Sequence, residues 1–294
     1  MISNSQSVGR GLPAYAWAGL LVMIVSEAAM LRRIEPFWSW HTPIAWTGYL
    51  LFVDGWIWKR RGQSWLQNAP AEFAFLACAS VPLWLVFELY NKFTLHNWYY
   101  VGLPENLLLR YFGYAWSFAT ISPAIFMTAE LIASLRDRRA PEWRRARRVP
   151  VPLGTLGWIS IAIGVFMLVL PILYPSPWLA APVWLGFIFL LDPLNAASRD
   201  EGSESIRGDF AAGHRARFVN LLAAGLVCGV IWEFWNYWSR TKWIYVVPVP
   251  PNIKIFEMPI AGYGGFPAFA IECFVMYVFV RRWIWRGAWR PISL

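Results

Sequence analysis

Two glutamates lie in apolar stretches of the chain, and each is followed three residues later by an asparagine: Glu88 by Asn91, and Glu233 by Asn236. At this spacing on a helix, the acid and the amide share one face. A carboxyl group in apolar surroundings is costly to ionise, so it stays protonated or paired, and a protonated carboxyl can donate a proton. The alternative is structural: each pair ties its helix to the following loop by hydrogen-bonding backbone groups that lipid cannot satisfy.

These pairs belong to a motif that occurs twice, 145 residues apart: Phe87-Glu88-x-Tyr90-Asn91-x-Phe93-x4-Trp98-x-Tyr100-Val101 and Trp232-Glu233-x-Trp235-Asn236-x-Trp238-x4-Trp243-x-Tyr245-Val246. A second repeated motif has an offset of 138 residues and reads Trp46-x-Gly48-Tyr49-x4-Asp54 and Trp184-x-Gly186-Phe187-x4-Asp192. The two repeats predict an internal duplication that covers nearly the whole chain. Beside the acids, we expect the amides and the aromatic residues of the motif to contact a substrate: Asn91, Asn236, Trp98, Tyr100, Trp243 and Tyr245.

Glu272 has no counterpart in the first copy and falls near the middle of the last apolar stretch, where a carboxyl group is most costly. This stretch opens with Phe256-Glu257-Met258-Pro259 and Gly262-Tyr263-Gly264-Gly265, in which the glycines permit close packing or a broken turn. The divergence from the first copy predicts that the second half holds the specialised site, with Glu257 and Tyr263 near Glu272. The alternative is a buried structural hydrogen bond from Glu272 to a neighbouring helix.

Most other polar residues are interpreted as structural. Asp54 and Asp192 are expected to form ion pairs or helix caps at the inner surface. His41 and His96 do not repeat and lack metal-ligand spacing, and the three cysteines form no Cys-x-x-Cys motif, so we predict neither a metal nor a disulfide. The sequence has no Walker motif, dinucleotide fingerprint or nucleophile elbow, and we expect no cofactor.

The segments that carry these residues are predicted to be membrane-spanning helices. Hydrophobic residues make up 58% of the 294 residues and charged residues only 15%, so there is too little polar surface to cover a water-soluble globule. We predict an all-α integral membrane protein of about eight transmembrane helices, because eight apolar stretches are long enough to cross a hydrocarbon layer of ~30 Å. They lie near 13–31, 42–58, 72–90, 111–135, 153–174, 178–197, 217–237 and 260–280.

Lysine and arginine predict the orientation of these helices, because they are retained on the cytoplasmic side of a membrane. Basic clusters follow the second, fourth, sixth and eighth stretches, which places both termini in the cytoplasm of a bacterial-type inner membrane. We predict four helices in each half, 10–138 and 153–285, joined by an Arg- and Pro-rich cytoplasmic linker at 139–152. An even number of crossings makes the two repeats parallel. The net charge of +9 is explained by these short loops, so nucleic acid is not an expected partner.

The first half also carries an ordered series of motifs: Trp84-x3-Glu88, Asn97-Trp98-Tyr99-Tyr100, Leu103-Pro104-Glu105 and then an apolar helix. An acid on a span, a Trp/Tyr step, a Pro-Glu step and another span resemble the repeated unit of the heptahelical lycopene cyclases and related carotenoid-modifying membrane proteins. The resemblance covers about 50 residues in each half. It implies that acids, here Glu105 and Glu257, protonate a polyene end and remove a proton after ring closure.

Rearrangement or hydration of an alkene in such a protein requires a neutral carboxylic acid in a dry pocket, a carboxylate base, and aromatic faces that stabilise a carbocation. The second half supplies these types without a cofactor: Glu233, Glu257, Glu272, Trp243, Tyr245 and Tyr263. We therefore expect a protein that acts on or binds an isoprenoid or another membrane lipid. One alternative is a non-catalytic subunit of a larger energy-transducing or photosynthetic membrane complex that contacts lipid, quinone or pigment. A third possibility is a transporter, since paired halves suit alternating access.

Overall fold

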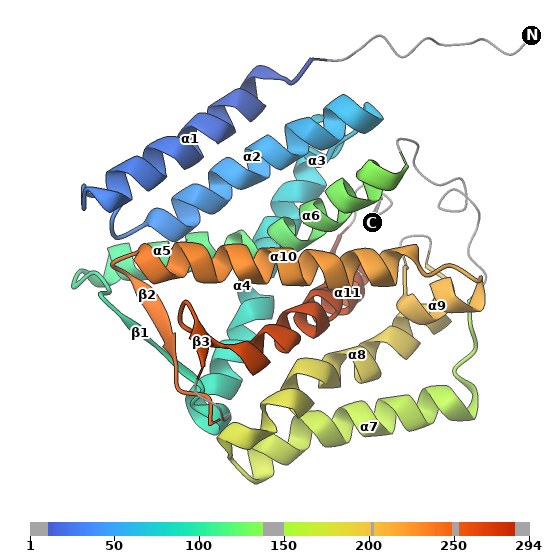
Figure 1. Cartoon of the computed structure of the whole chain (residues 1–294). Coiled ribbons are helices and arrows are strands. Elements are labelled where there is room, and N and C mark those ends of the chain that lie inside the picture. Colours follow the sequence, from blue (N-terminus) through green and yellow to red (C-terminus); the bar gives the residue numbers. More distant parts are fainter. Residues whose placement is uncertain (1–10, 138–149, 201–202, 249–252, 286–294) are drawn as a thin grey trace, which may run out of the picture.

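The computed structural model describes residues 11–137, 150–200, 203–248 and 253–285, and these are mainly helical (Figure 1). The longer helices are α1 (Ala14–Leu31), α2 (His41–Arg61), α4 (Pro70–Tyr90), α5 (Leu107–Ala119), α6 (Ile121–Arg136), α7 (Gly154–Leu173), α8 (Ala180–Ala197), α10 (Ala216–Trp238) and α11 (Gly265–Ile284). Short helical segments are α3 (Trp65–Asn68), η1 (Asn91–Leu95), η3 (Pro177–Leu179), α9 (Ile206–Ala211) and η4 (Ile260–Gly264). The strands are β1 (Trp98–Val101), β2 (Lys242–Tyr245), β3 (Lys254–Ile255) and β4 (Met258–Pro259). This arrangement confirms the predicted all-α membrane-type fold.

Within the described residues, seven helical segments are long and apolar enough to cross a membrane. They are Ala14–Leu31, Pro70–Leu95, Leu107–Arg136, Gly154–Leu173, Pro177–Ala197, Ala216–Trp238 and Ile260–Ile284, and they match seven of the eight predicted stretches. The remaining stretch, 42–58, folds as α2 but falls short in hydropathy, because it carries Asp54 among tryptophan, tyrosine and threonine residues. Arg10 and the basic residues at 138–149 and 286–294, which contribute to the predicted orientation, lie outside the described part of the chain.

Helices α1 and α2 form one helical hairpin, and α7 and α8 form another at the opposite side of the molecule (Figure 1). A glycine pair lies at each crossing: a Cβ atom on Gly19 would come within 2.5 Å of the Gly48 carbonyl oxygen, and one on Gly164 within 2.8 Å of the Gly186 carbonyl oxygen. Only glycine lets two helix backbones approach so closely. Since Gly48 and Gly186 occupy the same position of the repeated Trp-x-Gly motif, this motif encodes a helix crossing.

Between the two hairpins lie α4, α6, α10 and α11 (Figure 1). The middle of α11, from Phe269 to Val278, is buried against its neighbours α4, α6, α8 and α10. Helices α5 and α6 follow one another around Thr120, and a serine from α4 stabilises this junction. The Ser80 hydroxyl donates to the Phe118 carbonyl oxygen at 2.6 Å and accepts from the Ser122 backbone N–H at 3.0 Å. Backbone groups at this junction are thereby satisfied without water.

Asp54 and Asp192 each hold a short helix at the end of the molecule opposite β1 and β2. Asp54 accepts from the Leu66 backbone N–H at 3.1 Å, in α3, and Asp192 accepts from the backbone N–H groups of Ile206 at 2.7 Å and Arg207 at 2.8 Å, in α9. Carboxylate oxygens thus satisfy N–H groups that helix termini leave unpaired. The two aspartates of the repeated motif have the capping geometry expected from the sequence.

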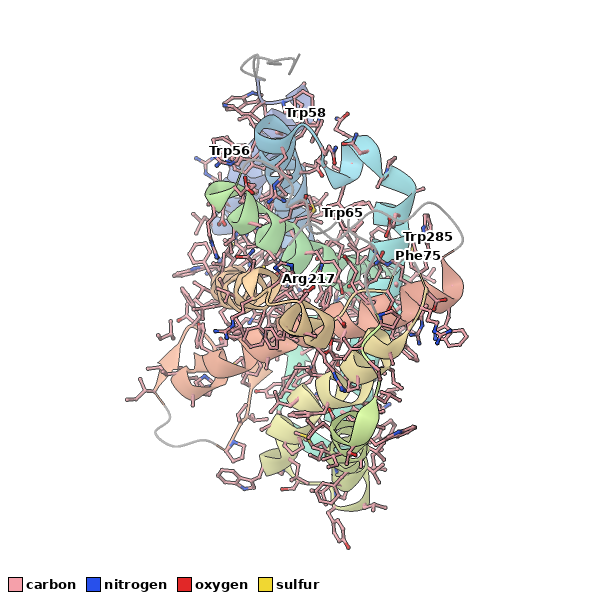
Figure 2. All side chains as sticks on the ribbon, turned by 90° about the vertical axis from the view of Figure 1, so that its right-hand side faces the viewer. Trp56, Trp58, Trp65, Phe75, Arg217 and Trp285 are labelled. Carbon is pink, nitrogen blue, oxygen red and sulfur yellow. The ribbon has the colours of Figure 1, made fainter. Side chains whose placement is uncertain are left out.

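Two arginines of the basic clusters that are predicted to lie in loops, Arg217 after the sixth apolar stretch and Arg281 after the eighth, are buried instead, and each is 1% exposed. Arg217 lies near the start of α10, at the centre of the view in Figure 2, where it contacts Glu204 at 3.0 Å and Asp209 of α9 at 3.2 Å. Arg281 contacts Glu72 at 2.9 Å. The loop assignment was wrong for these two residues because buried carboxylates, which their local sequence does not reveal, compensate the loss of hydration.

Candidate functional site

Strands β1 and β2 form a two-stranded antiparallel ribbon, and each strand comes from one copy of the repeated acid–amide motif. Trp98 pairs with Tyr245, Tyr100 pairs with Trp243, and Tyr99 faces Ile244 at the centre. Because Ile244 is the residue 145 positions after Tyr99, this central pair consists of equivalent residues. The ribbon therefore has a local two-fold axis between its strands.

The repeated asparagines anchor the ribbon to the helices. Asn91 donates from Nδ2 to the Trp98 carbonyl oxygen at 2.8 Å and accepts at Oδ1 from the backbone N–H groups of Asn97 at 2.7 Å and Trp98 at 3.1 Å. Asn236 makes the corresponding pair of bonds with Trp243, at 2.8 Å from Nδ2 and 2.9 Å to Oδ1. Both asparagines are buried, so these bonds satisfy strand groups that have no access to water.

The repeated glutamates bind the aromatic side chains of the same strands. Glu88 Oε1 accepts from the Tyr100 hydroxyl at 2.5 Å and from the Trp98 indole N–H at 3.3 Å. In the second copy, Glu233 Oε1 accepts from the Tyr245 hydroxyl at 3.1 Å and from the Trp243 indole N–H at 3.3 Å. Each acid thus fixes the orientation of one tyrosine and one tryptophan of the ribbon.

The two copies differ in one donor. Glu88 also accepts from the Trp84 indole N–H at 2.8 Å, whereas the residue equivalent to Trp84 is Gly229. The ring of Phe266 occupies the space beside Gly229, within 2.2 Å of where a Cβ atom would lie. Glu233 Oε1 therefore accepts two hydrogen bonds where Glu88 Oε1 accepts three, and the buried Oε2 of Glu233 has no hydrogen-bond partner among the described residues.

Tyr100 and Tyr245 lie between the candidate spans, and both remain protonated at neutral pH. Burial, followed by the adjacent carboxyl group of Glu88, raises the pKa of Tyr100 well above its usual value of 10.0. Burial and the carboxyl group of Glu233 raise the pKa of Tyr245 in the same way. A buried phenol next to a carboxyl group is costly to ionise, so both hydroxyls act as hydrogen-bond donors.

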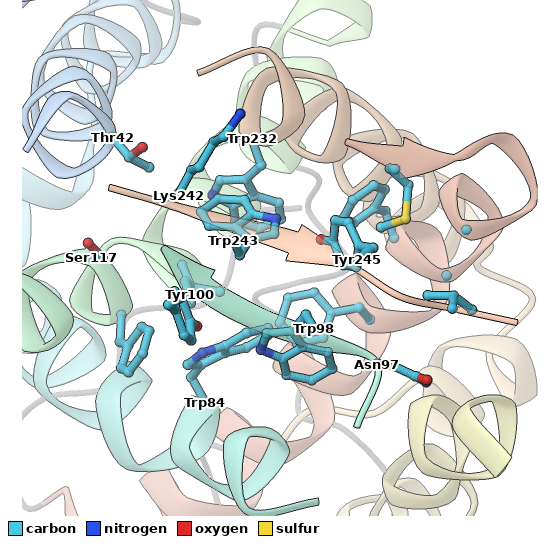
Figure 3. A pocket seen from close by; sticks show the side chains of 18 of the residues that line it. Thr42, Trp84, Asn97, Trp98, Tyr100, Ser117, Trp232, Lys242, Trp243 and Tyr245 are labelled. Carbon is cyan, nitrogen blue, oxygen red and sulfur yellow. The ribbon is translucent and has the colours of Figure 1, made fainter. Parts of the chain in front are cut away.

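The ribbon lines a cavity of about 540 Å³ (Figure 3). This volume lies within the range of about 300 to 1,000 Å³ that is common for small-molecule sites. The rest of the wall comes from helices α2, α4, α5, α6, α8, α10 and α11, segments η3 and η4, strand β4 and the adjoining loops. Eight tryptophans are among the described lining residues: Trp40, Trp46, Trp84, Trp98, Trp178, Trp184, Trp232 and Trp243.

Both halves of the chain contribute to the cavity through equivalent residues. Trp46 of α2 and Trp184 of α8 occupy the first position of the Trp-x-Gly motif, and both line it. The ribbon residues Trp98 and Trp243 occupy equivalent positions of the acid–amide motif, as do Tyr100 and Tyr245, and all four line the cavity. The cavity is consequently lined by residues from both occurrences of each motif.

The structure brings four of the predicted substrate-contacting residues to the cavity wall and places the other predicted residues elsewhere. Trp98, Tyr100, Trp243 and Tyr245 line the cavity. The acids Glu88 and Glu233 lie behind these aromatic residues, outside the lining, and the asparagines anchor the backbone of the ribbon.

The predicted site residues that follow the second strand are not gathered at the cavity. Glu257 binds Lys242 at 2.7 Å, and the Tyr263 hydroxyl donates to the Ile255 carbonyl oxygen at 3.0 Å. Glu272 is buried between α8 and α11, where its Oε1 accepts from the Phe187 backbone N–H at 3.2 Å. This bond is the buried structural hydrogen bond to a neighbouring helix that was the alternative to a catalytic role for Glu272. Glu105, implied by the cyclase resemblance, is exposed and does not line the cavity.

His41 belongs to a polar cluster on the α1–α2 hairpin that sequence reasoning did not predict. Its Nδ1 atom lies 2.8 Å from the Ser26 hydroxyl and its Nε2 atom 3.5 Å from Glu27, which also accepts from the Trp235 indole N–H at 2.6 Å. These contacts tie the hairpin to α10. His96 lies at the end of η1, away from this cluster, and no group of three potential metal ligands occurs in the described ranges.

Sequence reasoning also did not identify several polar residues of the cavity wall, among them Thr42, Arg110 and Ser117. They belong to helices distant in sequence and to no repeated motif, so their proximity depends on tertiary packing. The one available signal was the four-residue distance from Thr42 to the motif residue Trp46.

Comparison of the chain with protein-family models, curated proteins and solved structures finds no match. The resemblance to carotenoid-modifying membrane proteins therefore remains an expectation from the motifs. Any functional conclusion must come from the geometry of the cavity.

Proposed function

We propose that this chain is a multi-pass membrane protein that binds a largely hydrocarbon molecule, of the isoprenoid or lipid class, in the cavity beside the β1–β2 ribbon. The observation that carries the proposal is the cavity of about 540 Å³ with a mainly apolar wall that includes eight indole rings. Flat aromatic faces offer a large contact area to an unsaturated or extended chain at a low cost in side-chain entropy. Few polar groups line the cavity, which disfavours a small hydrophilic solute.

The proposed membrane arrangement is two parallel four-helix units, with α1, α2, α4 and α5–α6 in one and α7, α8, α10 and α11 in the other. In this arrangement α2 is the eighth crossing, because it packs on α1 through the glycine pair in the same way as α8 packs on α7. The matched asparagine and glutamate contacts of the ribbon support the same relation. The cavity then lies near the axis between the units, where paired-repeat membrane proteins place their ligand sites.

The apolar exterior supports insertion in a bilayer. On α7, Leu156, Trp158 and Phe166 are each more than half exposed, which would be unfavourable in water. The basic residues Lys59 and Arg60 lie at the same end of the molecule as α9, opposite the ribbon. The proposed orientation places this end in the cytoplasm and the cavity near the outer surface, in a bacterial-type inner membrane.

A second candidate function is acid–base chemistry on the bound molecule, which the Tyr–Glu pairs favour. Tyr100 and Tyr245 line the cavity, and Glu88 and Glu233 lie one hydrogen bond behind them. In such a transfer, protonated Glu233 would give its proton to the Tyr245 oxygen while the Tyr245 hydroxyl gives its own proton to the bound molecule, which leaves a neutral tyrosine and the Glu233 carboxylate. Mass spectrometry of lipids and pigments from cells that produce wild type or Glu233→Gln tests this candidate, and identical profiles that also match cells without the protein would refute it.

Binding can be tested directly with protein purified in neutral-lipid nanodiscs. We expect the wild type to retain apolar molecules that solvent extraction releases, and Trp184→Leu to bind them roughly tenfold more weakly, because an indole wall of the cavity is lost. Gly265→Leu should have a similar effect by filling the cavity, since a Cβ atom at Gly265 meets nothing within 4 Å and its backbone is already helical. The matched control is Trp158→Leu, on the outer face of α7, where 62% of Trp158 is exposed.

The outcome that contradicts the proposal is equally clear. If wild type releases no specific molecule, or if both cavity variants retain it as well as Trp158→Leu does, the cavity is not a ligand site. Thermal melting of each variant in the same nanodiscs separates loss of binding from loss of folding.

A further inference from the structure

We propose that the ligand is an amphiphile with an anionic head group, most simply a phosphate-bearing isoprenoid, and that the head group binds at the Arg110 end of the cavity. This inference rests on the proposed function and specifies the chemical class of the ligand. It is carried by a one-ended arrangement of polar groups in an otherwise aromatic wall.

One face of α5 provides the first part of this arrangement. Arg110, Tyr114 and Ser117 all line the cavity and follow a spacing of four and three residues, which places them on one side of the helix. At a rise of ~1.5 Å per residue, Arg110 lies about 10 Å from Ser117 along the helix axis. Arg110 is thus near the start of α5 and Ser117 is two turns deeper, which suits a charged head above a buried chain.

Arg110 is held in place and retains donors for a ligand. Its Nε–H donates to the Pro104 carbonyl oxygen at 2.9 Å, which leaves the terminal nitrogens of the guanidinium. In the described part of the chain, Arg110 forms no ion pair with a carboxylate. The other cation of the cavity wall, Lys242, is already bound to Glu257 at 2.7 Å. A planar guanidinium with free donors matches phosphate oxygens in geometry and charge.

A buried hydroxyl is the second, independent observation. Thr42 lines the cavity from α2 with 7% of its surface exposed, and its Oγ1 atom has no hydrogen-bond partner. Helix α5 packs on α2 here, because the Trp116 indole N–H donates to the Thr47 hydroxyl at 3.0 Å. Figure 3 shows Thr42 and Ser117 at the same side of the cavity. A buried hydroxyl without a partner is costly, and a ligand oxygen would satisfy it.

The opposite half does not reproduce this polar end. The position equivalent to Thr42 is Ala180, four residues before Trp184, and it lines the cavity without a hydroxyl. Asn97 lies at the far side of the cavity (Figure 3), and it is uncharged. An amphiphile would therefore place its head group near Arg110 and its chain along the indoles of both halves.

A matched pair of probes tests the inference: farnesyl phosphate and the neutral farnesol, titrated into the full chain in nanodiscs of neutral lipid and followed by calorimetry. We expect wild type to bind farnesyl phosphate at least about tenfold more tightly than farnesol, because a charge-assisted Arg–phosphate contact adds to chain burial. Arg110→Gln should abolish this preference and leave the affinity for farnesol unchanged. Lys92→Gln, which removes an exposed charge of η1 outside the cavity lining, should retain the preference.

Each other outcome has a defined meaning. Equal binding of the two probes by wild type, or an undiminished preference in Arg110→Gln, overturns the anionic head group while the binding function stands. Failure of both probes to bind counts against the binding function itself. Inorganic phosphate should compete only weakly, because it lacks the chain; competition as strong as that of farnesyl phosphate would show a free-anion site and overturn the amphiphile.

Discussion

Replacing Asn91 with leucine removes three hydrogen bonds that hold β1, whereas replacing Asn236 removes two that hold β2. Each bond removed leaves a buried backbone group without a partner, at a cost of about 1 kcal/mol or more, so Asn91→Leu should lower the free energy of opening the ribbon by at least about 3 kcal/mol and Asn236→Leu by at least about 2 kcal/mol. Leucine has the same branched arrangement of side-chain heavy atoms as asparagine, so no cavity is left behind, and the added bulk of its methyl groups is the same in both variants. The two variants therefore report on hydrogen bonding rather than on packing.

Hydrogen exchange measures this opening directly, because an amide exchanges when its local structure opens. A loss of about 3 kcal/mol corresponds to exchange at the Trp98 amide that is a little over a hundredfold faster, and about 2 kcal/mol to roughly thirtyfold faster exchange at the Trp243 amide. The measurement uses nanodisc-embedded protein with peptide-level or residue-level readout. Asn68→Leu at the opposite end of the molecule is the control and should leave both amides unchanged.

The reasoning is refuted if Asn91→Leu changes exchange at Trp98 by less than about threefold. It is also refuted if Asn236→Leu has the larger effect, because the order of the two effects follows from the number of bonds. If Asn68→Leu speeds exchange at the Trp98 and Trp243 amides as much as the two ribbon variants do, exchange reports the global stability of the protein and not the opening of the ribbon.

Two further predictions concern the ribbon tyrosines and the helix crossings. Tyr100 and Tyr245 have a raised pKa in the folded state, so the stability that they contribute is present below the unfolded pKa near 10 and is lost as the pH rises from there through the folded pKa. Tyr100→Phe and Tyr245→Phe should therefore make the melting temperature fall less steeply with pH in the alkaline range. An unchanged dependence of melting temperature on pH in both variants would contradict the raised pKa of these tyrosines. Gly186→Leu should destabilise the α7–α8 hairpin by about 1 to 3 kcal/mol, because a Cβ atom there would lie 2.6 Å from Leu168 Cγ, whereas Gly11→Ala, with open space around it, should leave the thermal midpoint unchanged.

The sequence predicted most helices because length and hydropathy are local properties. Seven apolar stretches needed no knowledge of tertiary contacts to be recognised. The stretch at 42–58 shows the limit of this approach, since α2 forms a long helix whose Asp54 is stabilised by the Leu66 and Ser64 groups of a neighbouring segment. The stretch has a low mean hydropathy because it contains polar residues such as Asp54, which are paired in the folded protein, and it is nevertheless helical.

The candidate site was predictable only where the duplication exposed it. Trp98, Tyr100 and their counterparts were found because they recur at fixed distances from a glutamate. Arg110 and Ser117 were missed, because their role depends on the packing of α5 against α2. Glu272 was expected at the site because of its depth, but a single acid in an apolar stretch gives no information about which cavity, if any, it faces.

The two-fold relation of the ribbon has a consequence for the direction in which a ligand lies. A cavity with equivalent walls on both sides presents the same surface to a molecule and to that molecule turned end for end, so full symmetry would hold an asymmetric ligand in two orientations at equal occupancy. Only the positions at which the copies differ remove this degeneracy. In this chain Thr42 corresponds to Ala180 and Trp84 corresponds to Gly229, and of these four residues Gly229 alone does not line the cavity. These differences between the copies, together with Arg110, and not the indoles that both copies share, would set the direction in which a molecule bound in the cavity points.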